Sequence, residues 1–186
     1  MTGPPLTPAA MDVEHLEAIR ASVAEAQRGA IERFVAPGAV VLDVAPQVHA
    51  GVRPLLPDGA TLETLDLDPE AGATYTADLC RHNPEIPSAR FDCIFCTEVL
   101  EHTLQPFDAV GELERVLAPG GHLVLTTPFN FRIHGPLPDC WRFTEHGLRA
   151  LLADFEIVEL TAIETPDRPL MPIHYRTIAR RPGASI

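Results

Sequence analysis

The chain has 186 residues and a formal net charge of −12, and its 14 basic residues are all arginine. This length predicts a single domain with a sizeable apolar core. The negative charge argues against binding to nucleic acid or to an anionic membrane, because both repel an acidic surface. The lack of lysine removes the side chain that forms Schiff bases with carbonyl substrates.

Targeting signals and membrane segments are not recognisable in the sequence. No apolar run reaches the roughly 20 residues that span a bilayer, and the first residues lack the basic-then-apolar pattern of a secretion signal. We therefore expect a cytoplasmic protein whose partner is a small-molecule substrate, with no nucleic acid and no membrane as partners. The sequence leaves open whether the chain forms a homodimer.

The first half of the chain shows alternating helix and strand patterns. Residues 1–10 are rich in proline and threonine and are predicted to be a disordered tail, with a single domain over residues 11–186. The proline-rich passage over residues 46–59 has room for one short helix at most. The other elements predicted before residue 80 are a helix over 12–34 and strands over 40–45, 62–67 and 74–77.

A strand–helix–strand unit follows. Residues 92–97 form an apolar run bounded by polar residues, typical of a strand buried on both faces. A helix comes next and is predicted to end at Pro119-Gly120-Gly121, before a second buried strand over residues 122–127. Five apolar residues mark the buried face of this helix: Phe107, Val110, Leu113, Val116 and Leu117. The unit predicts a parallel crossover with ligands beside the ends of both strands.

The four cysteines are expected to be thiols. Cys93 and Cys96 form a CxxC pair, but residues three apart on a strand point to opposite faces, so their sulfurs cannot bind one metal ion. Both are predicted to be buried in the core, whereas Cys140 lies in a loop and is expected to be exposed.

The last part of the chain begins with a proline- and aromatic-rich loop, residues 129–143. A loop of this length in a compact domain is often a lid or a binding loop. Thr144 is a predicted N-cap for a helix that runs through Leu152. Residues 155–160 and 174–179 are predicted strands with no helix between them. Their connection carries three prolines, Pro166, Pro169 and Pro172.

The pattern FDxIxxTEVLEH, followed by a helix, LxPGG and a strand that ends in TP, resembles the class I S-adenosylmethionine-dependent methyltransferases. The resemblance is to a small bacterial group that acts on sugars and other small metabolites, and it runs from about Val40 to Arg181. It implies an α/β fold with a Rossmann-like, mostly parallel sheet, helices on both faces and a closing antiparallel strand pair. It also implies S-adenosyl-L-methionine as the cofactor.

In that family, a strand that ends in an acid is followed by a glycine-rich turn around the methionine portion of the cofactor. The resemblance assigns Asp43, Ala45 and Gly51 to this region, where glycine permits close approach and positive φ. The turn departs from the family pattern, because it holds Ala45 and Pro46 and keeps only Gly51. The alternative is a proline-stiffened connection that binds no ligand. No GxGxxG is present, so no dinucleotide site is predicted.

The resemblance also places acids at the ends of the next two strands. Asp66 would accept hydrogen bonds from both ribose hydroxyls, as the equivalent acid does in dinucleotide-binding folds, and Asp68 is its near competitor. Asp78 and Leu79 would meet the adenine, with Asp78 accepting from the amino group.

Thr97 and Glu98 follow a buried strand, where side chains face the cleft, and they are predicted to contact the cofactor. His102 lies four residues after Glu98 and shares its face if the segment is helical. The pair can hold a general base or provide two metal ligands. The sequence places no further ligands, so no metal site is predicted. The alternative is that His102 packs under the following loop.

The long loop resembles the H-x-x-P-x-D-x-W/Y-R-F/Y-T segment of the small methyltransferase group, and we predict that it binds the acceptor. His134 is the candidate base, because imidazole changes charge near neutral pH, and Asp139 can orient it. Phe129 and Trp141 can wall the pocket, and Arg142 can hold a carboxylate or phosphate. The alternatives are a structural ion pair between Arg142 and Asp139 and a core position for Trp141.

The favoured function is S-adenosylmethionine-dependent methyl transfer to a small molecule, a sugar or secondary metabolite, with O-methylation as the first choice. A second hypothesis keeps the fold without methyl transfer, as an isomerase, a cyclase or a ligand-binding protein in a biosynthetic pathway. The altered turn after the first strand is its evidence. A partner-binding protein with an inactive pocket is the least favoured, because Glu98, His134, Asp139 and Arg142 occur together.

Overall fold

The computed structural model describes residues 9–46 and 50–183. Most of the predicted N-terminal tail lies outside these residues. Its last residue, Ala10, begins helix α1 (Ala10–Phe34), so the predicted boundary of the tail is wrong at that position. None of the helices in the described ranges is both long and apolar enough to cross a membrane.

Seven strands form one sheet that is parallel except for β7. The order across the sheet is β3-β2-β1-β4-β5-β7-β6, and β7 runs antiparallel to both β5 and β6. The predicted α/β fold with a closing antiparallel pair is confirmed. The strands are β1 (Val40–Val44), β2 (Thr61–Asp66), β3 (Tyr75–Thr76), β4 (Phe91–Thr97), β5 (Leu117–Pro128), β6 (Glu156–Thr165) and β7 (Arg168–Arg180).

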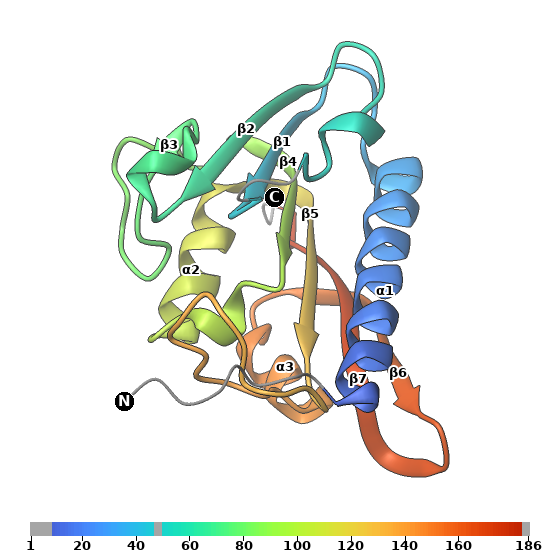
Figure 1. The fold of residues 1–186 in the computed structure, drawn as a ribbon. Helices are drawn as coiled ribbons and strands as arrows, with labels where there is room; N and C mark the ends of the chain where they lie inside the picture. The colour runs from blue at the N-terminus through green and yellow to red at the C-terminus, as the bar shows by residue number, and fades with distance from the viewer. Residues whose placement is uncertain (1–8, 47–49, 184–186) are drawn as a thin grey trace, which may run out of the picture.

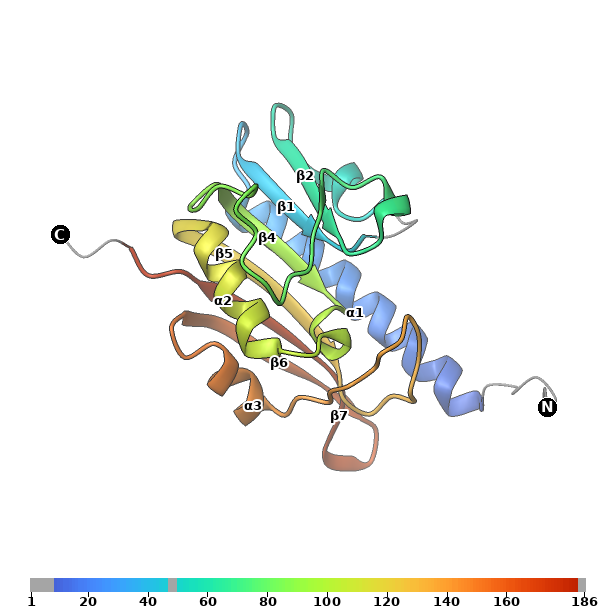
Figure 2. The same ribbon diagram turned by 90° about the vertical axis from the view of Figure 1, so that its left-hand side faces the viewer.

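Helices cover both faces of the sheet (Figures 1 and 2). Helix α1 packs on one face, and α2 (Pro106–Val116) and α3 (Glu145–Leu151) pack on the other. On β4, Cys93 and Phe95 lie in the core beneath α1, whereas Ile94 and Cys96 lie in the core beneath α2 and α3. The opposite directions predicted for the two buried thiols are confirmed, as is the exposure of Cys140.

Helix α2 passes directly into β5, without the predicted glycine stop. The helix ends at Val116, and Leu117 is already extended and pairs with Phe91 of β4. The sequence Pro119-Gly120-Gly121 therefore lies inside β5. A Cβ on Gly121 would lie 2.9 Å from a backbone oxygen of β4, so glycine here permits close contact between strands.

The buried face of α2 differs from the prediction at one residue. Val110, Leu113 and Val116 are buried, but Phe107 is 65% exposed. Nine residues correspond to about two and a half helical turns, so Phe107 and Val116 lie on opposite sides of the helix.

The closing hairpin is longer than predicted, and only two residues separate β6 from β7. Pro169 and Pro172, predicted in the connection, lie inside β7. The pairing of β6 with β7 shifts register between Ile163 and Thr165, opposite these prolines. Irregular pairing of this kind accommodates residues that have no backbone N–H to donate.

The long loop and the start of the helix after it are as predicted, and the helix ends at Leu151, one residue before the predicted Leu152. Residues 129–144 contain no helix or strand. Thr144 caps α3, because its side-chain oxygen accepts a hydrogen bond from the N–H of Gly147 at 3.1 Å. Three short 3-10 helices complete the described elements: η1 (Arg53–Leu55), η2 (Pro69–Ala71) and η3 (Leu100–His102).

Candidate active site

The candidate crevice lies where β1 and β4 meet, because the strand order reverses between them. The residue that follows each strand has a left-handed backbone without being glycine: φ is 51° at Ala45 and 56° at Glu98. This conformation costs about 1–2 kcal/mol for a residue with a Cβ. It persists where the surrounding structure determines it, often at functional sites. Ala45 thus adopts a backbone conformation that glycine takes at lower cost.

Asp43 and Gly51 form the inner part of the turn after β1. Asp43 is 2% exposed, and its Oδ2 accepts a hydrogen bond from the N–H of Val52 at 3.0 Å. A Cβ on Gly51 would lie 2.0 Å from this oxygen, so only glycine fits. Burial raises the pKa of Asp43 to about 6, although the Val52 N–H and the charge of Arg53 oppose the rise. The position of the Asp43 carboxyl therefore requires glycine at residue 51.

Asp66 and Asp43 line the same open depression, together with Arg53 and Thr64. Asp66 is buried at the end of β2, and its Oδ1 accepts the N–H of Asp68 at 3.0 Å. Asp68 is exposed, and its own carboxylate accepts the N–H of Glu70 at 2.9 Å, which caps η2. The structure therefore places Asp66, and not Asp68, beside the crevice.

Asp78 and Leu79 lie after β3. The carboxylate of Asp78 accepts the N–H of Cys80 at 2.9 Å and pairs with Arg81 at 3.1 Å. The side chain of Leu79 is buried in the core. Their predicted contact with adenine stays a prediction.

The carboxylate of Glu98 belongs to a network that joins four elements. Its Oε1 accepts hydrogen bonds from the hydroxyl of Thr126 at 2.9 Å and from Nε2 of His174 at 2.6 Å. The other ring nitrogen of His174 is 2.8 Å from the hydroxyl of Ser22 on α1. Thr97, the last residue of β4, pairs with Thr126 of β5. The network holds the strand ends and α1 together at the crevice.

The predicted pairing of Glu98 with His102 is wrong. Glu98 is left-handed and the following turn is a 3-10 helix, so the two side chains do not share the face of one α-helix. Nδ1 of His102 instead lies 2.9 Å from the carbonyl oxygen of Pro138, in the long loop. His174, the actual partner of Glu98, was not selected from the sequence, where a histidine within an apolar strand was its only signal.

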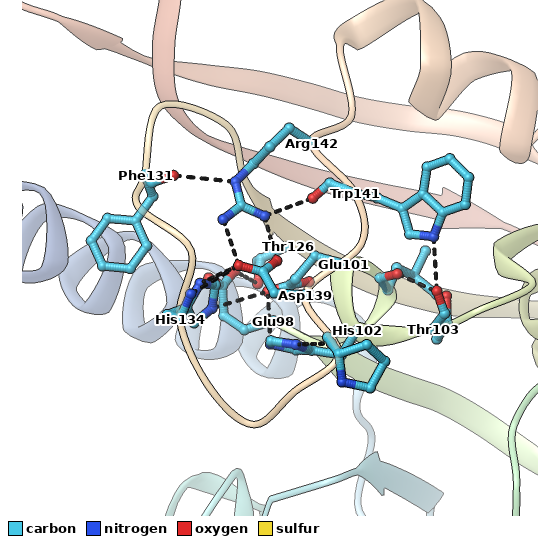
Figure 3. A network of polar contacts seen from close by, with 12 residues as sticks. Glu98, Glu101, His102, Thr103, Thr126, Phe131, His134, Asp139, Trp141 and Arg142 are labelled. Atoms are coloured by element: carbon cyan, nitrogen blue, oxygen red, sulfur yellow. Dashed lines mark hydrogen bonds and ion pairs between the residues drawn. The ribbon is translucent and has the colours of Figure 1, made fainter. Parts of the chain in front are cut away.

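Asp139 organises the long loop (Figure 3). Its Oδ2 accepts the backbone N–H of His134 at 2.9 Å and lies 3.1 Å from Nδ1 of the same histidine. Arg142 binds both carboxylate oxygens, at 2.5 and 2.7 Å. This guanidinium is the main cause that lowers the pKa of Asp139 to about 2. The predicted contact between Asp139 and His134 is confirmed, and so is the alternative of an Asp139–Arg142 ion pair.

The guanidinium of Arg142 uses all its N–H groups within the loop. Besides the two bonds to Asp139, it donates to the carbonyl oxygens of Phe131, Arg132 and Trp141. No N–H remains for a substrate carboxylate or phosphate in this arrangement. The predicted role of Arg142 in substrate binding therefore requires a rearranged loop.

The two aromatic residues predicted to wall the pocket lie at opposite ends of the loop. Trp141 is 41% exposed, so it is not a core residue, and its indole N–H donates to the carbonyl oxygen of Thr103 at 2.8 Å. Phe129 packs edge-on against Tyr175. Their contacts with a substrate stay predictions.

Glu101 is the second site residue that was not selected from the sequence. Its side chain is 0% exposed, and neither carboxylate oxygen has a hydrogen-bond partner among the described residues. Burial, together with the nearby carboxylates of Glu98 and Asp139, raises its pKa well above the ordinary value. Its backbone oxygen accepts the N–H groups of Cys140 and Trp141, which seats the loop on η3. The only signal was its place in the TEVLEH motif.

A family model described as a methyltransferase domain matches residues 19–160. The chain belongs to this family of methyltransferase domains. Among curated proteins, a ubiquinone biosynthesis O-methyltransferase from Alkalilimnicola ehrlichii is 32% identical to it over 68 residues. The matched segment is 37% of this chain and spans only 27% of that relative.

Solved structures share the fold of this methyltransferase domain at low sequence identity. The cyclase SpnF has a TM-score of 0.70 and 16% identity, over 89% of this chain and 83% of that one. The 1,6-didemethyltoxoflavin-N1-methyltransferase of Burkholderia thailandensis was solved with bound 1,6-didemethyltoxoflavin and S-adenosylhomocysteine. It has a TM-score of 0.59 and 21% identity, over 96% of this chain and 94% of that one. The N-methyltransferase NodS from Bradyrhizobium japonicum has a TM-score of 0.61 and 19% identity, over 88% of this chain and 96% of that one.

Replacing Ala45 by glycine should stabilise the protein by about 0.5–1 kcal/mol, because the left-handed strain outweighs the entropy that glycine adds to the unfolded chain. Ala89, which also has a positive φ but lies at the other end of β4, gives the matched control. Denaturant unfolding should show a similar gain for Ala89→Gly. If Ala45→Gly destabilises the protein while Ala89→Gly stabilises it, the strain at Ala45 is not released by glycine.

Replacing Asp43 by asparagine should change how stability depends on pH. The folded-state pKa of Asp43, about 6, lies above the ordinary value of 3.8. Stability that comes from the neutral carboxyl is therefore complete below about pH 4 and is lost as the pH rises through 6. The difference in unfolding free energy between Asp43→Asn and the wild type should grow by about 1–3 kcal/mol from pH 4 to 8. Unfolding free energies from urea titrations that change in parallel with pH for Asp43→Asn and the wild type would contradict this.

Proposed function

We propose that this methyltransferase domain transfers a methyl group from S-adenosyl-L-methionine to a hydroxyl oxygen of a small molecule, such as a sugar or a secondary metabolite. The observation that carries the proposal is the placement of two imidazoles. His134 in the loop and His102 in η3 stack edge to face, with ring centres 5.0 Å apart, just beyond the end of β4. Groups that can accept a proton thus lie beside the crevice at the switch in strand order.

The residues at the crevice fit this cofactor. Asp66 keeps one carboxylate oxygen on the backbone of Asp68 and can offer the other to the ribose hydroxyls. The left-handed turns at Ala45 and Glu98 can enclose the methionine portion, with Asp43 beneath them. The bound cofactor supplies a methyl group on a sulfonium ion. The chain then has to align the acceptor oxygen with that methyl for in-line displacement, and positioning supplies most of the acceleration.

His134 has the geometry of a proton acceptor. Nδ1 of His134 is hydrogen-bonded to the carbonyl oxygen of Arg132 at 3.3 Å and lies 3.1 Å from the carboxylate of Asp139. Both partners can only accept, so the ring hydrogen lies on Nδ1 and the lone pair on Nε2. That lone pair can take the proton of an acceptor hydroxyl. A hydroxyl acceptor has to lose a proton when it is methylated, and His134 can take that proton. We therefore favour an oxygen acceptor, and the curated relative is also an O-methyltransferase by name.

A second function, in which the fold binds a ligand without methyl transfer, is favoured by one observation. Ala45 and Pro46 stand in the turn after β1, where the family that the sequence resembles has glycines. The fold alone does not decide, since the cyclase SpnF shares it. The deciding experiment offers methyl-labelled S-adenosylmethionine and a panel of hydroxyl-bearing small molecules to the protein. Labelled product with S-adenosylhomocysteine supports the first function, and cofactor binding without label transfer supports the second.

Replacing Asp66 by asparagine should weaken S-adenosylmethionine binding about 10- to 100-fold, because a hydrogen bond to a charged group contributes about 1.5–3 kcal/mol. Asparagine can still accept the N–H of Asp68, so the backbone turn is kept. Asp68→Asn is the matched control and should leave the affinity nearly unchanged, because Asp68 caps η2. Calorimetry measures both, and equal losses would contradict the assignment of Asp66.

Replacing His134 by alanine should lower turnover on the order of 10²–10⁴-fold if its ring takes part in proton removal. The affinity for S-adenosylmethionine should stay nearly unchanged, because the imidazole lies on the acceptor side. The exposed His146 of α3 provides the control variant His146→Ala, which should keep full turnover. Normal turnover of His134→Ala together with an inactive His102→Ala would move the essential imidazole from the loop to η3.

A further inference from the structure

We infer that Glu101, His102 and His134 form a binding site for one divalent transition-metal ion. Oε1 of Glu101 lies 3.7 Å from Nε2 of His102 and 3.9 Å from Nε2 of His134. The three ligand atoms lie within 4.8 Å of one another. The contacts to Glu101 are too long for hydrogen bonds. Three potential donor atoms from two segments thus face one another at contacts longer than hydrogen bonds. Figure 3 shows the three residues.

The outer contacts of both imidazoles leave the inner nitrogens ready to bind a metal. Nδ1 of His102 faces the carbonyl oxygen of Pro138 at 2.9 Å, and Nδ1 of His134 faces the carboxylate of Asp139 at 3.1 Å. Both partners can only accept, so each Nδ1 carries the hydrogen and each Nε2 has a free lone pair. Metal-binding histidines are oriented in this way by a carbonyl or a carboxylate.

In its charged form, Glu101 lacks a hydrogen-bonded positive partner among the described residues. Its carboxylate is buried and makes no hydrogen bond among the described residues. The guanidinium of Arg142 is committed to Asp139 and to three carbonyl oxygens. A buried carboxylate without a partner is strongly unfavourable. An ion between Glu101 and the two imidazoles would pair it.

The donor set selects the kind of ion. Two imidazole nitrogens and one carboxylate oxygen suit Zn²⁺, Fe²⁺ or Co²⁺, whereas Mg²⁺ prefers oxygen ligands. Ligand atoms bound at about 2.1 Å to one ion lie roughly 3.0–3.5 Å apart, so side-chain movements on the order of 0.5 Å would assemble the site. The side chains of His102 and His134 are partly exposed, so an ion can enter and keep a position open for a substrate.

The role of this ion in catalysis rests on the proposed function, but its binding does not. A bound divalent cation would lower the pKa of an acceptor hydroxyl that it contacts. His134 would then hold the ion in place of taking the proton itself. Loss of turnover in His134→Ala fits both roles, so ion binding has to be measured directly.

The test is calorimetric titration of untagged, chelator-treated protein with Zn²⁺, Co²⁺ and Mg²⁺. We expect one Zn²⁺ or Co²⁺ per chain and no comparable binding of Mg²⁺. Glu101→Gln, His102→Gln and His134→Gln should each weaken Zn²⁺ binding more than tenfold. Asp139→Asn, which acts through the orientation of His134, should weaken it about 10- to 100-fold.

His82→Gln is the matched control. His82 lies 3.7 Å from Glu112, the same distance that separates His102 from Glu101, but it is exposed, and Glu112 is already bound to Arg115. This variant should bind Zn²⁺ like the wild type. A loss in His82→Gln equal to that in His102→Gln would overturn the inference.

Thermal unfolding separates loss of the site from loss of the fold. Zn²⁺ should raise the Tm of the wild type but not that of Glu101→Gln. Without the ion, Glu101→Gln should melt at or above the wild-type temperature, because the amide replaces a buried carboxyl of the same shape that has no hydrogen-bond partner among the described residues. The inference is overturned if the wild type binds no ion at millimolar concentration, or if Glu101→Gln binds as tightly as the wild type. Ion binding without any methyl transfer would instead overturn the proposed function and leave the site intact.

Discussion

The left-handed backbone at Glu98 determines which side chains of the site point into the sheet and which point toward the long loop. It turns the chain out of β4 so that the carboxylate of Glu98 meets Thr126 and His174, on β5 and β7. The next turn, η3, then directs Glu101 and His102 toward the long loop. A strained residue is retained when its neighbours hold it, and here contacts from several elements do so. One backbone position thus separates an internal network from the cluster that faces the loop.

The long loop is preformed, because its own charged pair and η3 fix it at several points. Asp139 accepts the backbone N–H of His134 and lies 3.1 Å from Nδ1 of its ring. The guanidinium of Arg142 closes the loop by donating to carbonyl oxygens of the loop. The backbone oxygen of Glu101 adds two further hydrogen bonds from the loop. Because the pKa of Asp139 is lowered to about 2, this anchor stays charged at any ordinary pH. Preformed loops place reacting groups with little loss of entropy on binding.

The sheet could be predicted because its evidence is local, whereas much of the site depends on contacts between distant residues. The apolar run of β4 and the opposite directions of Cys93 and Cys96 follow from a period of two. His174 and Glu98 are 76 residues apart, and the sequence around neither residue indicates that they interact. Asp139 was recognised because the loop resembles a known motif. Glu101 was overlooked because its burial only becomes visible once the loop covers η3.

The errors in element boundaries also have physical causes. Pro119-Gly120-Gly121 has the composition of a helix end, yet the helix ends earlier, at Val116. The next residue, Leu117, already pairs with Phe91 of β4 as the first residue of β5. Pro172 was expected in a connection, but the irregular pairing of β6 and β7 tolerates its missing N–H. In both places tertiary pairing overrides the local signal.

The chain contains a single tryptophan, and it lies in the loop between Cys140 and Arg142. The indole N–H of Trp141 donates to a carbonyl oxygen beside η3, its ring stacks on Phe143, and part of it meets solvent. Indole emission responds to hydrogen bonding and to contact with water. The intrinsic fluorescence of the protein is therefore an optical reporter of how the loop sits on η3, with no added label and no second indole to mask it.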